Sequence, residues 1–255
     1  MEAEKSTPAP ASGRRAVARL MWFGRLILIH FALVSGAASP AKAETSAEVE
    51  IKSDDRFRGR SMSGGEPVID ADISVDLASG LYAGASATFI LSGQDRAGFQ
   101  GVDGFVGYAT RISDGVTIDV GAAGYVFTER YSGNARNRYA EVYAGVSTGG
   151  FAAYLHYAPR YFDKDTSVLY ADLNFARPIG ADFTLQAHVG LLVQTAGTAR
   201  LGGRSTRYDT RLALSRPLFG LDTEVAWTFA GPDDRYFHGP WSGNSALVVS
   251  VSKHF

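Results

Sequence analysis

The sequence contains no cysteine, which excludes disulfide frameworks, thiol nucleophiles and cysteine-ligated metals. It also lacks a strong net charge: 25 basic and 26 acidic residues give no electrostatic indication of a nucleic-acid partner. After residue 43, no apolar run is long enough for a transmembrane helix, and no segment has a sustained helical period. What is abundant instead is glycine, with 29 residues, together with 12 tyrosines and 15 phenylalanines. This composition favours a β-protein.

The first 43 residues have the pattern of a cleaved export signal. Four arginines precede the apolar stretch "LILIHFALV", and the small residues of "AKA" at 41–43 follow at the spacing of a cleavage site. Met21 would itself start a compact version of this signal and is an alternative start. An uncleaved membrane anchor is the other interpretation, but the apolar run is short for a spanning helix. We therefore predict a signal peptide at 1–43 and one exported domain at 44–255.

The exported part alternates apolar and polar residues in segments of about ten, as β-strands with two different faces do. In "VIDADISVDL", Ile69, Ala71 and Ile73 fall on one face, and Asp70 and Asp72 fall on the other. The alternation predicts about twelve strands, at about 46–58, 66–77, 81–90, 102–112, 116–128, 138–147, 151–161, 167–177, 183–195, 206–216, 222–230 and 245–255.

The connections between these strands alternate in length. Short connections such as "ASG" and "SDG" alternate along the chain with longer polar connections such as "AGTARLGGRST". Short turns at one end and long loops at the other are typical of outer-membrane barrels, and an even strand number puts both termini at the short-turn end. The sequence therefore predicts an all-β fold, a transmembrane antiparallel up-and-down β-barrel of about twelve strands. The interior glycines are expected to make room for aromatic side chains.

The last alternating run, "SALVVSVSKHF", continues to Phe255. In hydrocarbon every backbone polar group must be paired, so the last strand should pair with the first. A terminal aromatic would then lie in the interfacial girdle. It also resembles the signal read by the outer-membrane assembly machinery, which implies that machinery as a partner. Lys253, on the expected outward face, departs from this pattern.

The segment "DDRFRGRSMSGGEPVIDADISVDLASGLYAG" (54–84) resembles the opening hairpin of the TorF-like porins, a family of proteobacterial outer-membrane barrels also classed as conserved proteins of unknown function. The matching residues are Arg56, Phe57, Arg58, Gly59, Ser61, Ser63, Pro67, Gly80, Tyr82 and Gly84. Met62 stands where the family pattern has glutamine, and Asp55 where it has an aromatic. The resemblance implies a bacterial outer-membrane location, contact with lipid and lipopolysaccharide, and a pore.

A pore requires a polar lumen. If the polar face of each strand points inward, the lumen is lined by more acidic than basic residues. The expected pore-lining residues are Arg56, Arg58, Asp70, Asp72, Asp76, Asp119, Glu141, Arg160, Arg207, Asp209, Arg211 and Glu224. An acidic lining concentrates cations. The first hypothesis is therefore a passive channel for small hydrophilic solutes or ions, with a weak cation preference.

The alternative is that these charges pair across a narrow lumen and occlude it. Glu48 and Glu50 with Arg207, Asp209 and Arg211 would suit such a network. The barrel would then be non-conducting, and its outer loops would bind a partner or lipopolysaccharide.

An outer-membrane lipid enzyme is the third hypothesis. The exported histidines, His156, His188, His238 and His254, are not followed by the serine–asparagine pair of such lipases. The segment 238–244, "HGPWSGN", has the residue types at the wrong spacing for triad chemistry. No motif for a phosphate, zinc or nucleic-acid site occurs, so we expect no enzyme and no cofactor. The acidic clusters at 162–167 and 231–237 are expected to be solvated turns.

Overall fold

A computed structural model describes residues 43–91, 98–128, 138–162, 164–197, 205–231 and 244–255. In these ranges the regular secondary structure is entirely β-strand. No helix in the described part of the chain is long and apolar enough to cross a membrane. The expected signal peptide lies outside the described residues except for Ala43, and the first strand begins at the next residue.

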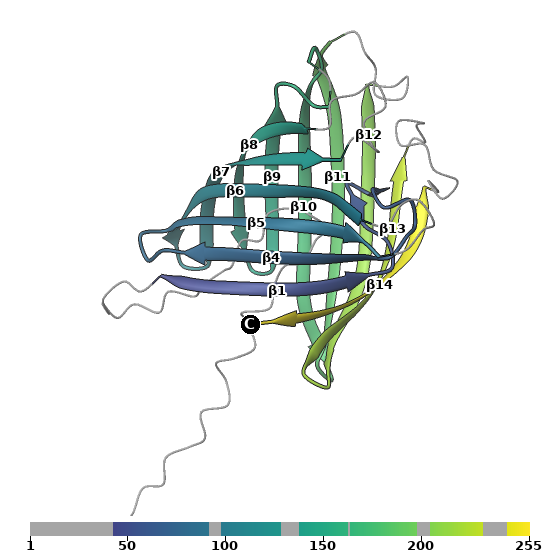
Figure 1. Cartoon of the computed structure of the whole chain (residues 1–255). Helices are drawn as coiled ribbons and strands as arrows, with labels where there is room; N and C mark the ends of the chain where they lie inside the picture. Colours follow the sequence, from purple (N-terminus) through teal and green to yellow (C-terminus); the bar gives the residue numbers. More distant parts are fainter. Residues whose placement is uncertain (1–42, 92–97, 129–137, 163, 198–204, 232–243) are drawn as a thin grey trace, which may run out of the picture.

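Twelve strands of the described chain form one closed antiparallel barrel, and two short strands form a separate hairpin (Figure 1). The barrel strands are β1 Glu44–Lys52, β4 Val68–Asp76, β5 Leu81–Ile90, β6 Gly98–Ser113, β7 Val116–Phe127, β8 Arg138–Thr148, β9 Phe151–Ala158, β10 Ser167–Gly180, β11 Phe183–Ala196, β12 Thr206–Leu218, β13 Leu221–Gly231 and β14 Ser245–His254. The hairpin strands are β2 Arg56–Phe57 and β3 Arg60–Ser61. The predicted fold class is confirmed.

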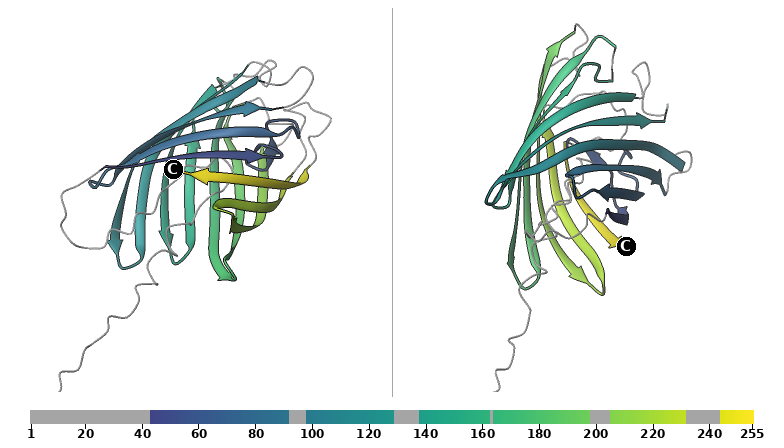
Figure 2. Two further views of the ribbon diagram at one scale, coloured as in Figure 1. Left: turned by 60° about the horizontal axis from the view of Figure 1, so that its bottom comes forward. Right: turned by 90° about the vertical axis from the view of Figure 1, so that its left-hand side faces the viewer.

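The barrel closes where the first strand meets the last. β1 pairs with β4 on one side and with β14 on the other, and Figure 2 shows β14 (yellow) beside β1 (purple). The Phe255 amide donates to the Ala47 carbonyl at 2.9 Å, and the Ala47 amide donates to the Phe255 carbonyl at 3.4 Å. The pairing expected of the last strand is therefore present, and it extends to the last residue of the chain.

Strand alternation divides the side chains into an inner polar set and an outer apolar set. Along β4, Asp70 and Ser74 are buried while Ile73 is 57% exposed. The same division holds on β11 and β12, where Val189 and Leu212 are each 51% exposed and His188 is buried. The faces predicted for these strands are confirmed. A polar interior and an apolar exterior are the reverse of a water-soluble fold and match a barrel in lipid.

The short connections all lie at the end of the barrel where β1 begins and β14 ends. Three of them are two-residue turns in which both residues have positive φ: Gly149–Gly150, Ala181–Asp182 and Phe219–Gly220. This is the type I′ geometry, whose twist matches that of the flanking strands. The opposite end carries the longer connections, among them residues 53–67. The predicted alternation of short and long connections is confirmed.

Several interior glycines lie directly opposite an aromatic residue on the neighbouring strand, as expected. Gly107 pairs with Tyr82, and Gly121 pairs with Tyr143. A Cβ atom on Gly121 would lie 2.2 Å from the Tyr143 hydroxyl. The ring therefore occupies the space above the glycine, where its hydroxyl is 2.6 Å from that of Tyr82. In these pairs the aromatic ring lies over the glycine of the neighbouring strand, on the lumen side of the wall.

We expect Gly121→Val to destabilise the barrel by about 1–3 kcal/mol, because the new side chain displaces Tyr143 from a packed position. The loss includes the hydrogen bond from Tyr143 to Tyr82, whose hydroxyl also donates to Asp119 at 2.6 Å. Urea unfolding in lipid vesicles measures the change. Gly124→Val on the same strand is the matched control, since nothing lies within 4 Å of a Cβ there. Equal losses in the two variants would contradict this packing argument.

Candidate functional site

The candidate site is the barrel lumen, and its main feature is a hairpin that the sequence did not predict. The first strand was expected to run from 46 to 58, but β1 ends at Lys52, and the chain then leaves the wall. Phe57 pairs with Arg60 across the two-residue turn Arg58–Gly59, with φ values of 47° and 75°. Positive φ at both positions defines a type I′ turn. Arginine is an unusual residue for its first position, because a Cβ disfavours left-handed backbone.

Asp54 holds the base of the hairpin together. Its carboxylate accepts hydrogen bonds from Arg56 Nε at 2.5 Å, from the hydroxyls of Ser61 and Ser63 at 2.5 and 2.9 Å, and from the Gly65 amide at 3.2 Å. A buried carboxylate with this many donors is well compensated. The hairpin is therefore a structured unit in its own right rather than a slack loop.

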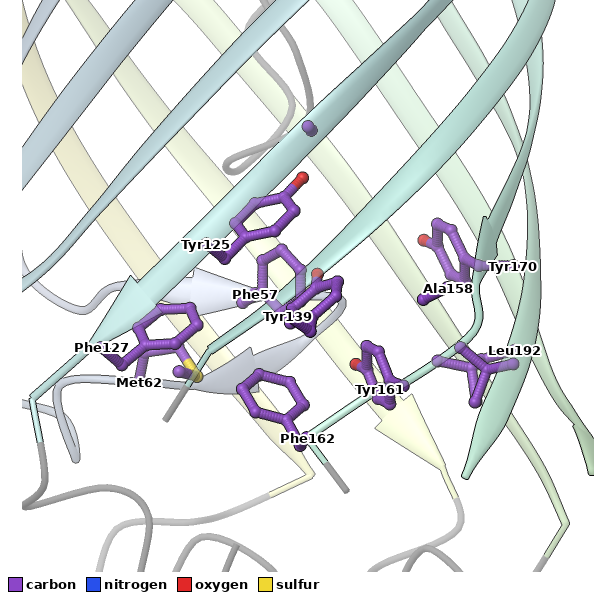
Figure 3. Close-up of a cluster of buried hydrophobic side chains, with 12 residues drawn as sticks. Phe57, Met62, Tyr125, Phe127, Tyr139, Ala158, Tyr161, Phe162, Tyr170 and Leu192 are labelled. Atoms are coloured by element: carbon purple, nitrogen blue, oxygen red, sulfur yellow. The ribbon is translucent and has the colours of Figure 1, made fainter. Parts of the chain in front are cut away.

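Aromatic side chains hold the hairpin against one wall of the barrel. Phe57 is 3% exposed, and its ring centroid lies 5.4 Å from that of Tyr125 and 6.4 Å from that of Tyr139. Figure 3 shows Phe57 pointing from the hairpin toward these two rings, with Met62 and Phe127 beside it. The cluster lies toward the long-loop end of β7 and β8. Burial of Phe57 and of Met62, which is 1% exposed, fixes the hairpin inside the lumen.

Arg58, at the tip, carries a positive charge into the barrel interior. Its NH2 group donates to Glu141 Oε2 on β8 at 2.7 Å, and the two side chains are only 4% and 0% exposed. The guanidinium also lies 4.1 Å from the ring centroid of Tyr170 on β10, within the range of a cation–π contact. A buried charge of this kind requires a partner of opposite sign. Glu141 supplies that partner from a position 83 residues further along the chain.

The hairpin tip reaches a second wall of the barrel. A Cβ atom on Gly59 would lie 2.7 Å from Cβ of Asp209 on β12 and 2.8 Å from Cβ of Ala230 on β13. Only glycine fits this approach together with the positive φ. The hairpin therefore spans the interior from its attachment at β1 and β4 to contacts on β7, β8, β10, β12 and β13.

Glu141 continues into a chain of polar contacts around the wall. His156 Nδ1 lies 3.2 Å from Glu141 Oε1, and its Nε2 lies 3.1 Å from Asp172 Oδ2. Asn174 donates from Nδ2 to the other carboxylate oxygen of Asp172. These residues come from β8, β9 and β10, on adjacent inward-facing positions. The contacts cross three strands without a gap.

The same chain continues through a second buried histidine. His188 Nδ1 lies 2.7 Å from Asn174 Oδ1, and its Nε2 lies 2.8 Å from Asp209 Oδ1. Tyr170 also contacts this histidine, and its hydroxyl lies 3.0 Å from His188 Nε2. The predicted residues Glu141 and Asp209 are thus joined through two histidines. Sequence reasoning considered both histidines only as candidates for lipase chemistry and gave them no role in a network.

A second charged cluster lies at the hairpin base. Lys52 Nζ contacts Asp70 and lies 3.4 Å from Asp55 Oδ1 and 3.5 Å from Glu50 Oε2. Glu48, expected to pair across the lumen, has His254 Nδ1 at 3.1 Å on the adjacent strand. Most of these ion pairs join residues of the barrel wall to one another, and the pair between Lys52 and Asp55 joins the wall to the base of the hairpin.

Nine of the twelve predicted lining residues lie on the inward face of barrel strands. They are Asp70, Asp72, Asp76, Asp119, Glu141, Arg207, Asp209, Arg211 and Glu224. The other three do not lie on a barrel strand. Arg56 and Arg58 belong to the hairpin rather than to a wall strand. Arg160 is exposed beyond β9, which ends at Ala158 because Pro159 has no amide to donate.

A cavity remains beside the hairpin. Its volume is about 60 Å³, and charged residues from both sides line it: Lys52, Arg56 and Arg58 face Asp209, Arg211 and Glu224. Space of this size holds about four water molecules. Arg211 and Glu224 contact each other directly across two neighbouring strands. The alternative enzyme residue His238, with the rest of 238–243, lies outside the described residues, and the described part contains no cluster of metal-ligating side chains.

The geometry can be compared with known proteins. A family model described as "Bacterial protein of unknown function (Gcw_chp)" matches residues 35–255. The chain belongs to this family. No curated protein matches the Gcw_chp chain. The family description does not carry the TorF-like name, so that resemblance stays a prediction.

Solved structures of two porins have a similar fold. The NanC porin superposes on the Gcw_chp chain with a TM-score of 0.55 at 14% identity, covering 81% of this chain and 97% of that one. The KdgM porin gives a TM-score of 0.50 at 14% identity, covering 82% of this chain and 99% of that one. At such low identity the likeness establishes a porin-type barrel and nothing finer about function.

Proposed function

We propose that this Gcw_chp protein is a bacterial outer-membrane barrel that forms a passive channel for small hydrophilic solutes or ions. The observation that carries the proposal is the closed barrel with a charged interior and an apolar exterior. An aqueous path needs the first feature, and contact with lipid needs the second. The fold of the NanC and KdgM porins supports it.

The outer-membrane location follows from three features taken together. The sequence predicts an export signal, closure satisfies the backbone hydrogen bonds that hydrocarbon cannot, and large apolar side chains cover the outside of the strands. Val106, Leu212 and Leu247 are each more than half exposed. A surface of this kind would aggregate in water. The TorF-like resemblance of residues 54–84 is part of the same proposal.

The first test is single-channel recording of the protein, purified from outer membranes, in a planar bilayer with a salt gradient. We expect discrete current steps and a reversal potential of the sign that favours cations, because acids outnumber bases on the inward face. Anion preference would contradict the acidic-lining argument. A folded, heat-modifiable barrel that never conducts, either intact or with residues 55–64 shortened, would contradict the channel itself.

Selectivity gives a finer prediction. Asp72→Asn is expected to move the reversal potential toward zero, since Asp72 lies on the inward face of β4 in the acid-rich part of the wall near Glu50 and Asp70. Its matched control is Asp114→Asn, in the short turn between β6 and β7, where the residue is exposed outside the lumen. An equal shift in both variants would mean that surface charge, not the lining, sets the selectivity.

A non-conducting barrel whose outer loops bind a partner or lipopolysaccharide is the second candidate. The hairpin favours it, because Phe57, Arg58 and Gly59 occupy the lumen and contact opposite walls. The two candidates differ when the hairpin is shortened. A channel should then conduct, whereas a binding barrel should stay silent and lose its partner only when its loops are changed. We expect no lipid hydrolysis from either.

A further inference from the structure

We propose that the β2–β3 hairpin is a movable plug, latched inside the lumen by the ion pair between Arg58 and Glu141, and that release of this latch opens the channel. The inference rests on the proposed function and deepens it, because it assigns the residues that regulate conduction.

The backbone of the hairpin forms its own sheet. Arg56 pairs with Ser61 and Phe57 with Arg60, and neither short strand joins the ladder of the barrel. The hairpin can therefore move without breaking a barrel ladder. All twelve wall strands keep their pairing when it does.

The ends of the hairpin segment are suited to a hinge. Ser53 is fixed to β14, since its amide donates to the Val249 carbonyl at 2.9 Å and its hydroxyl accepts from the Val249 amide at 3.0 Å. On the other side, Gly64 and Gly65 have φ values of 73° and 84°, which glycine adopts without a steric cost. The side chains of Arg56, Ser61 and Ser63 and the amide of Gly65 all donate to Asp54 and keep residues 54–65 rigid. The segment is built to swing as one body.

The latch is at the tip of the hairpin, where the charged side chain of Arg58 meets the barrel wall. Arg58 is held in left-handed backbone at φ 47°, a conformation that a residue with a Cβ leaves readily unless its surroundings hold it there. What holds it is the 2.7 Å contact with Glu141 and the Tyr170 ring at 4.1 Å. If Glu141 loses its charge, the guanidinium is left buried without a compensating carboxylate, and hydration outside the lumen becomes the better state.

Glu141 is itself connected to the wall. Besides Arg58, its carboxylate accepts from the Tyr125 hydroxyl at 3.2 Å and contacts His156 at 3.2 Å. The wall therefore positions the acceptor before the hairpin arrives. Phe57, packed against Tyr125 and Tyr139, adds an apolar contact that does not depend on charge. Near its tip the plug thus has two separable holds, one ionic and one aromatic, while Asp55 at its base contacts Gln100 on β6 and Lys52 on β1.

The experiment compares open probability and conductance of four full-length variants with those of the wild type in planar bilayers: Arg58→Gln, Glu141→Gln, the exchange Arg58→Glu with Glu141→Arg, and Arg216→Gln. Arg216 is an exposed arginine on the outward face of β12, over the ring of Phe183. We expect each of the two latch variants to raise the open probability at least tenfold. The exchange should return it toward the wild-type value, and Arg216→Gln should leave it unchanged.

A further variant separates the latch from the channel. It replaces residues 55–64 with a short glycine–serine link, and heat-modifiable mobility in gels verifies that every variant forms a barrel. If the shortened variant conducts continuously while Arg58→Gln and Glu141→Gln behave as wild type, the channel stands and the latch is overturned. If even the shortened variant never conducts, the proposed function fails and this inference fails with it. An increase in Arg216→Gln equal to that of the latch variants would also overturn the latch.

Discussion

Leu212→Arg is expected to lower the free energy of unfolding of the barrel in lipid by about 2–4 kcal/mol, the cost of an arginine at the bilayer midplane on a lipid-facing position. Leu212 lies in the middle of β12, on the outward face, and is 51% exposed. An exposed leucine in water would tolerate this change at almost no cost. The sign and size of the effect therefore report directly on the solvent that surrounds the barrel.

A depth series provides the control. Leu218 is also outward-facing but stands at the last position of the same strand, next to the short turn. There an arginine reaches the headgroups, so Leu218→Arg is expected to cost about 0–1 kcal/mol. Urea titration in phosphatidylcholine vesicles, followed by tryptophan fluorescence, measures both variants. Equal costs at the two positions would show that the middle of β12 is not in hydrocarbon.

Glu141→Ala is expected to cost about 3–5 kcal/mol if the hairpin stays in the lumen, since it leaves the buried Arg58 charge without its carboxylate. Release of the hairpin sets an upper limit to that cost, because the guanidinium can then be hydrated. Conduction and stability are therefore linked in this variant. A cost well below the expected range should come with a higher open probability.

Removal of both charges is the corresponding control. In the double variant Arg58→Met with Glu141→Met, no buried charge is left unpaired, and we expect most of the stability to return. Unfolding in vesicles and single-channel recording on the same preparations give both quantities. A Glu141→Ala variant with wild-type stability and wild-type conduction would contradict the view that this ion pair matters to the barrel.

The wall of the barrel could be predicted from the sequence because alternation reports which face each residue takes. Asp70, Asp119 and Glu141 each follow an apolar neighbour in a regular period of two, and all three point inward. Four of the five short turns carry a glycine at a position of positive φ, and Ala181–Asp182 is the exception. Twelve strands and their order then follow from closure and from the lengths of the connections.

The hairpin could not be predicted in the same way, because its sequence imitates a strand. In "RFRGRS", arginines alternate with other residues just as polar residues do on β1, so the period continues past the point where the wall ends. A signal was present nonetheless: "SDD" at 53–55 interrupts the apolar face after Lys52, and Gly59 marks a turn. The contact of Arg58 with Glu141 depends on the curvature of the closed barrel, which no local pattern contains.

The seam between β1 and β14 has a consequence for the order of assembly. β1 is at the start of the described domain and β14 at its end, and they share five residue pairs, whereas β1 and β4 share nine. A pairing this distant in the chain and this short forms late. The hairpin, which follows β1 directly, precedes β8 and β14 in the chain and is therefore made before either of them. Glu141 is on β8, so the guanidinium of Arg58 has no carboxylate partner until β8 has joined the growing sheet. The interior of this barrel is therefore completed by a segment made near the start of the chain.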